Sequence, residues 1–270
     1  MHVTEKNMRS FNVDHTSRIC ETLEESIIRI DDVVVLGRSS PDNLSDGRSS
    51  VCVAGHSKAR GFIRLYPTRM DSPLKVWNIV SVAVEKNPTD SRSESWKIKG
   101  SKAEWRNLSN KIDVVGNLRH GARLAYIDTV VSGCVTDLND SRRSIGIVKP
   151  VERSCYLSER SDYDPDTQKT LYGGVVPSDK HSFKHQPRVH YRCSECKSAN
   201  GHDQQILEWG VYEWFRKHPG AEEQVWENLF SKEKHQDIFF LVGNQARRLT
   251  SFMVISILRI PKQHAQAIYF

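Results

Sequence analysis

The sequence predicts an α+β protein, with a β-rich, barrel-like N-terminal region and a C-terminal α+β domain that a metal site stabilises. Three observations support this fold class. From Asp32 onward, short apolar runs alternate with turn-forming residues, which is typical of barrels and sandwiches. Residues 161–187 are rich in Asp, Pro, Gly and Ser, as linkers and long loops are. A cysteine–histidine cluster with the spacing of metal ligands begins at Cys193, beyond that segment.

The strands of the barrel-like region are predicted from short runs rich in Val, Ile and aromatic residues. We place this β-rich domain at 32–155 and a linker or long loop at 156–187. Strands are expected at 33–37, 51–55, 61–67, 76–86, 95–99, 123–131 and 144–152, with a short helix at 102–112.

The C-terminal domain, 188–270, combines both periodicities. Apolar residues of 203–217 fall on a broad helical arc, and 221–232 predicts a second helix. The runs DIFFLVG (237–243) and SFMVISILRI (251–260) predict two strands. Because only the short segment NQARRLT separates them, we expect a hairpin.

The first 31 residues predict a flexible start followed by an amphipathic helix over 14–30. Asp14 or Thr16 can cap this helix. Its apolar stripe suits packing on the body of the protein or docking on a protein partner. The stripe consists of Ile19, Leu23, Ile27 and Ile30.

Composition indicates an ordinary globular protein. The chain has 270 residues, 38% of them hydrophobic and 27% charged, so it can bury a core without disulfides. The polar N-terminus has no apolar signal-peptide region, and no apolar run approaches the roughly 20 residues that a membrane-spanning helix needs. Only two of the six cysteines are closely spaced. We therefore expect a cytoplasmic protein without membrane contact, whose thiols are free or bind metal.

Positive charge is concentrated in one part of the chain. The formal net charge is +6. Residues 32–150 hold 19 Lys and Arg against 12 Asp and Glu, a net of +7. A local excess of this kind favours a polyanionic partner, because phosphate contacts release bound counterions. The alternative is a basic surface that serves only solubility.

The most specific motif is Cys193-x-x-Cys196-x5-His202. Two cysteines at this spacing place both thiolates on one small knuckle, which suits two corners of a tetrahedral zinc site. Gly201 before the histidine lets the chain turn. We therefore expect a zinc-stabilised domain, with His190 as the first choice for the fourth ligand.

Other interpretations of this motif remain open. His181, His185, His218 or Cys155 can supply the fourth ligand instead. The cysteines can also be free thiols or a redox dithiol, although no βαβ pattern supports a thioredoxin-like fold. Two thiolates with one or two histidines are more typical of a closed structural site than of a catalytic one.

A pattern of basic and aromatic residues runs along the 61–67 strand. Side chains two residues apart share one face of a strand, so arginines and aromatic rings are expected side by side. Such a face suits stacking on bases and contacts with phosphates. The alternative is that Phe62 and Tyr66 belong to the core and the arginines extend past its edge. The residues expected to bind nucleic acid are Arg60, Phe62, Arg64, Tyr66, Arg69, Lys97, Lys99, Lys102, Arg142 and Arg143.

Residues 32–151 also carry a family resemblance. The segments DDVVVLGRSS, VCVAGHSKARGFIRLYP, PLKVWNIVSVAV and SRSESWKI are similar to the prokaryotic family described as a dual OB-containing domain. At Leu65-Tyr66 the chain departs from the W-[IV]-R-P type of sequence that is usual in that family. The resemblance implies an OB-like barrel that contacts oligonucleotides, in a mobile-element or defence setting. It transfers no catalytic residue.

These observations favour a nucleic-acid-binding protein, with DNA or RNA as its expected partner, over an enzyme. Nucleotide-cradling, zincin, deaminase and serine-hydrolase motifs are missing from the sequence. A metal-dependent nuclease or hydrolase using Asp203 or Glu208 is the second hypothesis. A protein–protein adaptor in a nucleoprotein complex, docking through the 14–30 helix, is the third.

Overall fold

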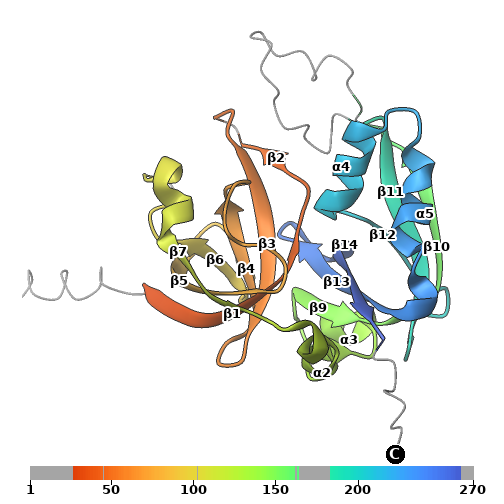
Figure 1. Cartoon of the computed structure of the whole chain (residues 1–270), viewed down its shortest axis with the longest axis horizontal. Helices are drawn as coiled ribbons and strands as arrows, with labels where there is room; N and C mark the ends of the chain where they lie inside the picture. The colour runs from red at the N-terminus through yellow and green to blue at the C-terminus, as the bar shows by residue number, and fades with distance from the viewer. Residues whose placement is uncertain (1–26, 45, 102, 162, 164–182, 263–270) are drawn as a thin grey trace, which may run out of the picture.

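The structure is a computed structural model that describes residues 27–44, 46–101, 103–161, 163 and 183–262. Its strands form a barrel and two smaller sheets, with the α-helices gathered around the smaller sheets (Figure 1). The predicted α+β architecture with a β-rich barrel is therefore confirmed. No helix in these ranges has the length and apolar content that a bilayer span requires.

The barrel is a closed ring of five strands within the first sheet. The ring order is β1-β3-β4-β6-β5, and pairing of β5 with β1 closes it. β4 and β6 run parallel, and the other pairs of the ring are antiparallel. These strands are β1 (Ile28–Arg38), β3 (Ser49–Ser57), β4 (Gly61–Thr68), β5 (Asn78–Lys86) and β6 (Ser95–Ile98). Two others, β2 (Asp42–Asn43) and β7 (Ile112–Asn117), add to β3 and β5.

The continuous apolar run of β1 arises because both faces of the strand are buried. Val33 and Val35 point into the barrel and pack with Ile63 and Leu65. Val34 and the alternate side chains of β1 instead contact the second half of the chain. A strand buried on both faces needs no polar alternation, which explains why this run was recognisable as a buried strand.

Three expectations about secondary structure differ from the structure. Ile28 to Ile30 begin β1 rather than end a helix, and residues 14–26 of the expected helix lie outside the described part. The expected helix at 102–112 is a 3-10 helix, η1 (Trp105–Lys111). The expected strand at 123–131 begins as a helix instead, α2 (Arg123–Asp128), which follows η2 (His120–Ala122). Its apolar residues are too few for their period to distinguish helix from strand.

The second unit, residues 131–262 in the described ranges, contains the two smaller sheets. A four-stranded sheet has the order β14-β13-β9-β8, and a three-stranded sheet has the order β10-β11-β12. The expected C-terminal hairpin is confirmed by the β13–β14 pairing. The strands are β8 (Val131–Ser132), β9 (Ile145–Val148), β10 (Pro150–Glu159), β11 (His185–Cys193), β12 (His202–Gln205), β13 (Gln236–Gln245) and β14 (Arg248–Pro261).

Helices cover the second unit. The helix expected from Asp203 begins only at Trp209, because Asp203 lies in β12, paired with β11. Val211, Tyr212 and Phe215 form the buried face of that helix. The helices are α3 (Val135–Asp140), α4 (Trp209–Lys217), η5 (Glu222–Gln224), α5 (Val225–Phe230) and η6 (Glu233–His235).

Sheet pairing assigns β9 and β10 to the second unit, although we placed residues up to 155 in the first domain. β9 pairs with β13, and β10 pairs with β11. β10 and β11 also occupy both ends of the segment expected as a linker at 156–187, of which 164–182 lies outside the described residues.

The barrel packs directly on the four-stranded sheet. Phe62 and Val34, from the outer face of the barrel, share one buried cluster with Ile147, Phe239 and Leu241. This contact covers the outside of β1, β3 and β4, and it determines which polar side chains are enclosed between the two units.

Candidate functional site

Three cysteines and one histidine converge in the second unit. The potential ligand atoms of Cys134, Cys193, Cys196 and His202 all lie within 4.8 Å of one another. The Nε2 atom of His202 is 3.3 Å from Sγ of Cys134 and 3.5 Å from Sγ of Cys196. This group can hold a metal ion.

Separate elements position the four side chains. Cys134 is the N-cap residue of α3, where its sulfur accepts a hydrogen bond from the Thr136 backbone N–H at 3.4 Å. Cys193 ends β11, and His202 begins the adjacent strand β12. Gly201, with a φ of 69°, adopts the left-handed conformation that returns the chain between them. The site therefore ties α3 to the three-stranded sheet.

The protonation chemistry of the site favours a cation. Burial raises the pKa of the Cys193 thiol, and the neighbouring sulfurs of Cys134 and Cys196 raise it further. Burial also lowers the pKa of His202, which keeps its imidazole in the neutral form that coordinates metals. Thiolates this close repel one another unless a cation lies between them, because the thiolate is the metal-binding form.

Three of the four predicted metal ligands lie in this group, and the fourth, His190, does not. His190 is exposed, and its Nε2 is 2.7 Å from the carbonyl oxygen of Asn200. It lies three positions before Cys193 on the same strand, so the two side chains point to opposite faces. The fourth member of the group is Cys134. Of the other candidates, His185, His218 and Cys155 lie outside the group, and His181 lies outside the described residues.

The predicted basic and aromatic face of β4 exists, but the second unit covers much of it. Phe62 is 7% exposed and Arg64 is 2% exposed. Arg64 donates a 3.0 Å hydrogen bond to the carbonyl oxygen of Ser144, beyond the barrel. Phe62 therefore lies in the core, which is the alternative that the sequence left open, and Arg64 is buried as well, because residues from a distant part of the chain cover both. Arg60 remains exposed, and half-buried Tyr66 accepts a hydrogen bond from Ser50.

The remaining basic candidates lie in different surroundings. Arg69 pairs with Asp71, and Lys97 lies 3.4 Å from Glu85 in an ion pair. Lys99 is exposed, and Lys102 lies outside the described residues. The exposed Arg142 and the half-buried Arg143 follow α3 directly.

A groove of about 440 Å³ lies where the barrel, α3 and the β13–β14 hairpin meet. We call it the basic groove because three arginines line it and the exposed cations Arg60 and Lys86 lie nearby. Lys86 donates a 2.6 Å hydrogen bond to Ser93 in the groove wall, and the charge of Arg60 acts on it. The lining residues are Ser91, Arg92, Ser93, Asn139, Arg142, Arg143, Ser144, Asn244 and Leu249.

Aromatic rings accompany these cations. The Lys86 ammonium lies 3.8 Å from the centroid of the Trp96 ring. The Arg143 guanidinium lies 5.2 Å from the centroid of Phe62. Sequence reasoning missed Lys86 and Arg92 because neither stands in a basic run.

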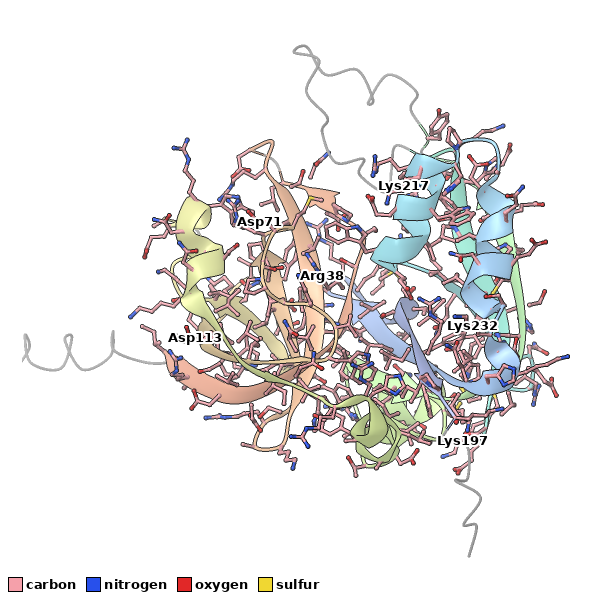
Figure 2. The ribbon with its side chains drawn as sticks, viewed as in Figure 1. Arg38, Asp71, Asp113, Lys197, Lys217 and Lys232 are labelled. Atoms are coloured by element: carbon pink, nitrogen blue, oxygen red, sulfur yellow. The ribbon has the colours of Figure 1, made fainter. Side chains whose placement is uncertain are left out.

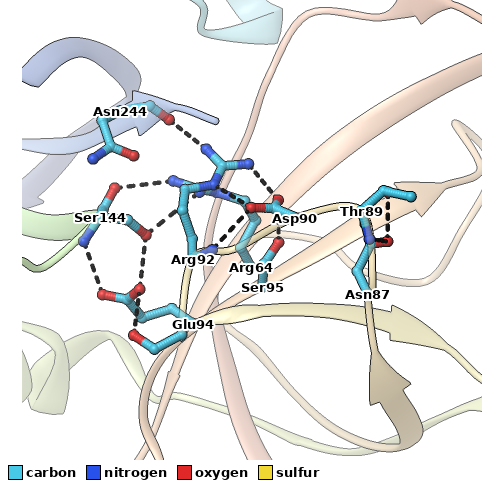
Figure 3. Close-up of polar contacts among 10 residues, drawn as sticks. Arg64, Asn87, Thr89, Asp90, Arg92, Glu94, Ser95, Ser144 and Asn244 are labelled. Atoms are coloured by element: carbon cyan, nitrogen blue, oxygen red, sulfur yellow. Dashed lines mark hydrogen bonds and ion pairs between the residues drawn. The ribbon is translucent and has the colours of Figure 1, made fainter. Parts of the chain in front are cut away.

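The acidic residues beside the groove are held by hydrogen bonds within the protein (Figure 3). Asp90 forms a 2.6 Å ion pair with Arg92. Glu94 accepts hydrogen bonds from the Ser144 backbone N–H at 2.9 Å and from its hydroxyl at 2.8 Å. Burial raises the pKa of each carboxyl group, but these hydrogen bonds outweigh it and hold both pKa values below their usual range. Arg92 therefore balances Asp90, whereas Glu94 keeps a charge that acts on Lys86 and Arg143. Arg60 and Arg142 are exposed and form no ion pair with the described residues.

The carboxylates considered for a nuclease do not gather at the metal group. Asp203 is exposed and accepts hydrogen bonds from Tyr156 and Arg188. Glu208 accepts a hydrogen bond from the Ile257 backbone N–H. Glu213 pairs with Arg216 along α4.

Two family models match the chain, one for each unit. Residues 29–124 match the family described as Domain of unknown function (DUF8758), and residues 136–270 match Domain of unknown function (DUF8757). Neither description names an OB-containing family. No curated protein matches the sequence. Because the second match spans half of the 270 residues, the chain belongs to the family described as Domain of unknown function (DUF8757).

Proposed function

We propose that this protein binds single-stranded nucleic acid in the basic groove and does so without catalysing a reaction. The observation that carries the proposal is the groove itself. Its exposed cations, Arg60, Lys86 and Arg142, come from three separate segments, and Arg60 and Arg142 form no ion pair with the described residues. Exposed cations attract phosphates, and the Trp96 ring beside Lys86 is typical of single-strand binding surfaces.

The topology of the barrel supports the same function. Its five strands form a Greek-key ring, in which β5 returns to pair with β1. We propose that this ring is an OB fold, a fold that binds oligonucleotides on its second and third strands and on the loops that follow strands 1 and 4. The second unit covers the outside of those two strands, β3 and β4, so the loops are the part left for binding. In this chain those loops are 39–48 and 87–94, and the second of them lines the basic groove.

The metal in the second unit is proposed to be a structural zinc. Three cysteines and a histidine are a typical closed, tetrahedral zinc set, with no position left for substrate. The site anchors the first residue of α3 through Cys134. The segment after that helix presents Arg142 and Arg143, whose backbone N–H groups donate to the carbonyl oxygens of Asn139 and Leu138 in its last turn. Zinc would therefore help to fix two arginines of the groove.

The test is the salt dependence of oligonucleotide binding, measured by fluorescence anisotropy with a labelled 12-nucleotide single strand. Binding should weaken steeply as the salt concentration rises from about 50 to about 200 mM, because added salt opposes the release of counterions from the strand. The triple variant Arg60→Ala/Lys86→Ala/Arg142→Ala should reduce the slope of log K against log salt by about 2, since each single-strand phosphate contact contributes about 0.7.

The matched control is Lys217→Ala/Lys232→Ala. Both lysines are exposed, one at the end of α4 and one after α5 (Figure 2). This variant should bind as the wild type does. Salt-independent binding, or equal loss in both variants, would contradict the proposal.

A further inference from the structure

A second cavity, of about 280 Å³, lies between the barrel and the second unit. We call it the junction pocket. Ser39, Cys52 and Tyr66 line it from the barrel, and Leu207 and Ile255 line it from the second unit. It shares Arg92 and Asn244 with the basic groove, so the two cavities adjoin at the contact between these residues. The Arg92 guanidinium donates a 2.5 Å hydrogen bond to the Asn244 carbonyl oxygen there (Figure 3).

The junction pocket contains a buried positive charge that no carboxylate pairs with. Arg64 lines the pocket, is 2% exposed and, within the described ranges, donates side-chain hydrogen bonds only to Ser144. Asp90 and Glu94 are the nearest acids, but Arg92 and Ser144 already engage them. A guanidinium has five N–H donors, so several of them remain for a ligand. Buried charges are normally paired, which makes an acceptor in this pocket favourable.

The wall between the junction pocket and the basic groove contains a buried acceptor, because Asn244 lines both cavities. Asn244 is 6% exposed, and among the described residues its side-chain oxygen Oδ1 has no hydrogen-bond partner. The amide orientation is fixed, because Nδ2 donates a 2.6 Å hydrogen bond to the carbonyl oxygen of Leu249. An unpartnered buried acceptor is costly and favours a ligand that brings an N–H group.

The rest of the lining is suited to a flat ring. Tyr66 offers an aromatic face, and Leu207, Met253 and Ile255 are apolar. The volume lies just under the roughly 300–1,000 Å³ typical of pockets for drug-sized ligands. It therefore suits one heterocycle better than a nucleotide strand.

We propose that the junction pocket takes one base of the strand bound in the basic groove, and that it selects a base with a carbonyl oxygen beside an N–H. Thymine, uracil and guanine have this arrangement. Arg64 donates to the carbonyl oxygen, and Asn244 Oδ1 accepts from the N–H. This inference rests on the proposed function, and it adds a base preference to what would otherwise be binding through phosphates.

The first experiment compares two 12-nucleotide strands that differ in one hydrogen-bond donor. One is oligothymidylate, and the other is its N3-methylthymine counterpart, which keeps the charge and carbonyl groups but loses the N–H. The wild type should bind oligothymidylate about tenfold more tightly than the methylated strand, because one buried hydrogen bond contributes about that much to the affinity. Equal affinity for the two strands would overturn the base pocket while leaving salt-dependent binding, and thus the proposed function, intact.

A blocking variant localises the effect. Ala246 is exposed and lines the mouth of the pocket, so Ala246→Trp can fill it without disturbing the core. This variant should lose the tenfold preference and keep the salt slope. Ala103→Trp changes another exposed alanine, away from both cavities, and should keep the preference. Loss of preference in both variants, or in neither, would contradict the assignment.

A direct probe separates failure of the pocket from failure of strand binding. Thymidine and N3-methylthymidine, as free nucleosides, are titrated into the full chain labelled with ¹⁵N at its arginine side chains. Thymidine should shift the Arg64 guanidinium signal, and the methylated nucleoside should not. If oligonucleotides fail to bind, a thymidine shift would still support the pocket. Absence of any shift, together with equal affinity for the two strands, would exclude it.

Discussion

The sulfur of Cys134 lies 3.3 Å from Nε2 of His202, although 68 residues separate them in the chain. Cys134 caps α3 and His202 begins β12, so this contact joins a short helix to the three-stranded sheet, alongside the ion pair between Asp137 and Lys197. A metal shared by the two therefore acts as a cross-link within the second unit.

We predict that Cys134→Ser abolishes stoichiometric metal binding. Wild-type protein should carry about one zinc per chain, because four suitable ligands form a complete tetrahedral set. Removing one thiolate leaves three ligands from two adjacent strands and releases α3. Metal analysis after dialysis checks the first effect, and the free energy of unfolding checks the second.

His190→Ala is the control for this prediction. His190 lies on the opposite face of β11 from the cluster and contacts Asn200. Its loss should leave zinc content unchanged. Equal zinc loss in both variants would show that the ligand set differs from the one described.

Metal removal should also weaken nucleic-acid binding. Chelation frees the N-terminus of α3, and the same helix positions Arg142 and Arg143 at its other end. We expect a several-fold loss of affinity for the 12-nucleotide strand while the barrel keeps its structure. Anisotropy before and after chelation, with zinc added back to the same sample, measures the effect. Unchanged affinity in metal-free protein would show that the metal site does not influence nucleic-acid binding in the basic groove.

The strands of the barrel were predictable because most of them are short apolar runs bounded by turns. The metal site was predictable only in its local part. Cys193, Cys196 and His202 can be recognised as metal ligands by their spacing in the sequence. Cys134 joins them only through the tertiary fold, which no local sequence pattern encodes. The same limit applies to Arg64. Its place on the face of β4 follows from alternation, but its burial depends on the remote segment around Ser144.

Glu208 predicts a pH dependence of stability. The residue is half-buried as a whole, but its carboxylate is enclosed beside β14, and burial raises its pKa from 4.5 to about 7. The folded state therefore holds a proton between pH 4.5 and 7 that the unfolded state releases. Stability is then greatest below pH 4.5 and falls as the pH rises to 7.

The size of this effect is bounded by the pKa shift. At about 1.4 kcal/mol per pH unit, the loss is at most about 3.5 kcal/mol. Glu208→Gln keeps an oxygen for the Ile257 backbone N–H but does not titrate. Urea denaturation at pH 5 and pH 7 should give a smaller difference for this variant than for the wild type. Identical differences would exclude Glu208 as the titrating group.

Substitutions of Arg92 and of the neighbouring Arg64 should have very different effects on the free energy of unfolding. Arg92 pairs with Asp90, and their side chains are 11% and 7% exposed. Arg92→Met leaves the Asp90 carboxylate without its cation, which should cost about 3–5 kcal/mol. The free energy of unfolding in urea measures this loss, and Asp90→Asn/Arg92→Met should recover part of it because no charge is left unpaired.

Arg64→Met should instead change stability by no more than about 1 kcal/mol, because replacing an unpaired buried charge by an apolar side chain of similar length removes a desolvation cost. No acceptor is orphaned, since the Ser144 carbonyl oxygen keeps its 2.9 Å bond from the Asn244 backbone N–H. The same variant should lose the preference for thymine over N3-methylthymine. A large loss of stability would mean that Arg64 supports the fold, whereas a stable variant that keeps the preference would show that the base is recognised elsewhere.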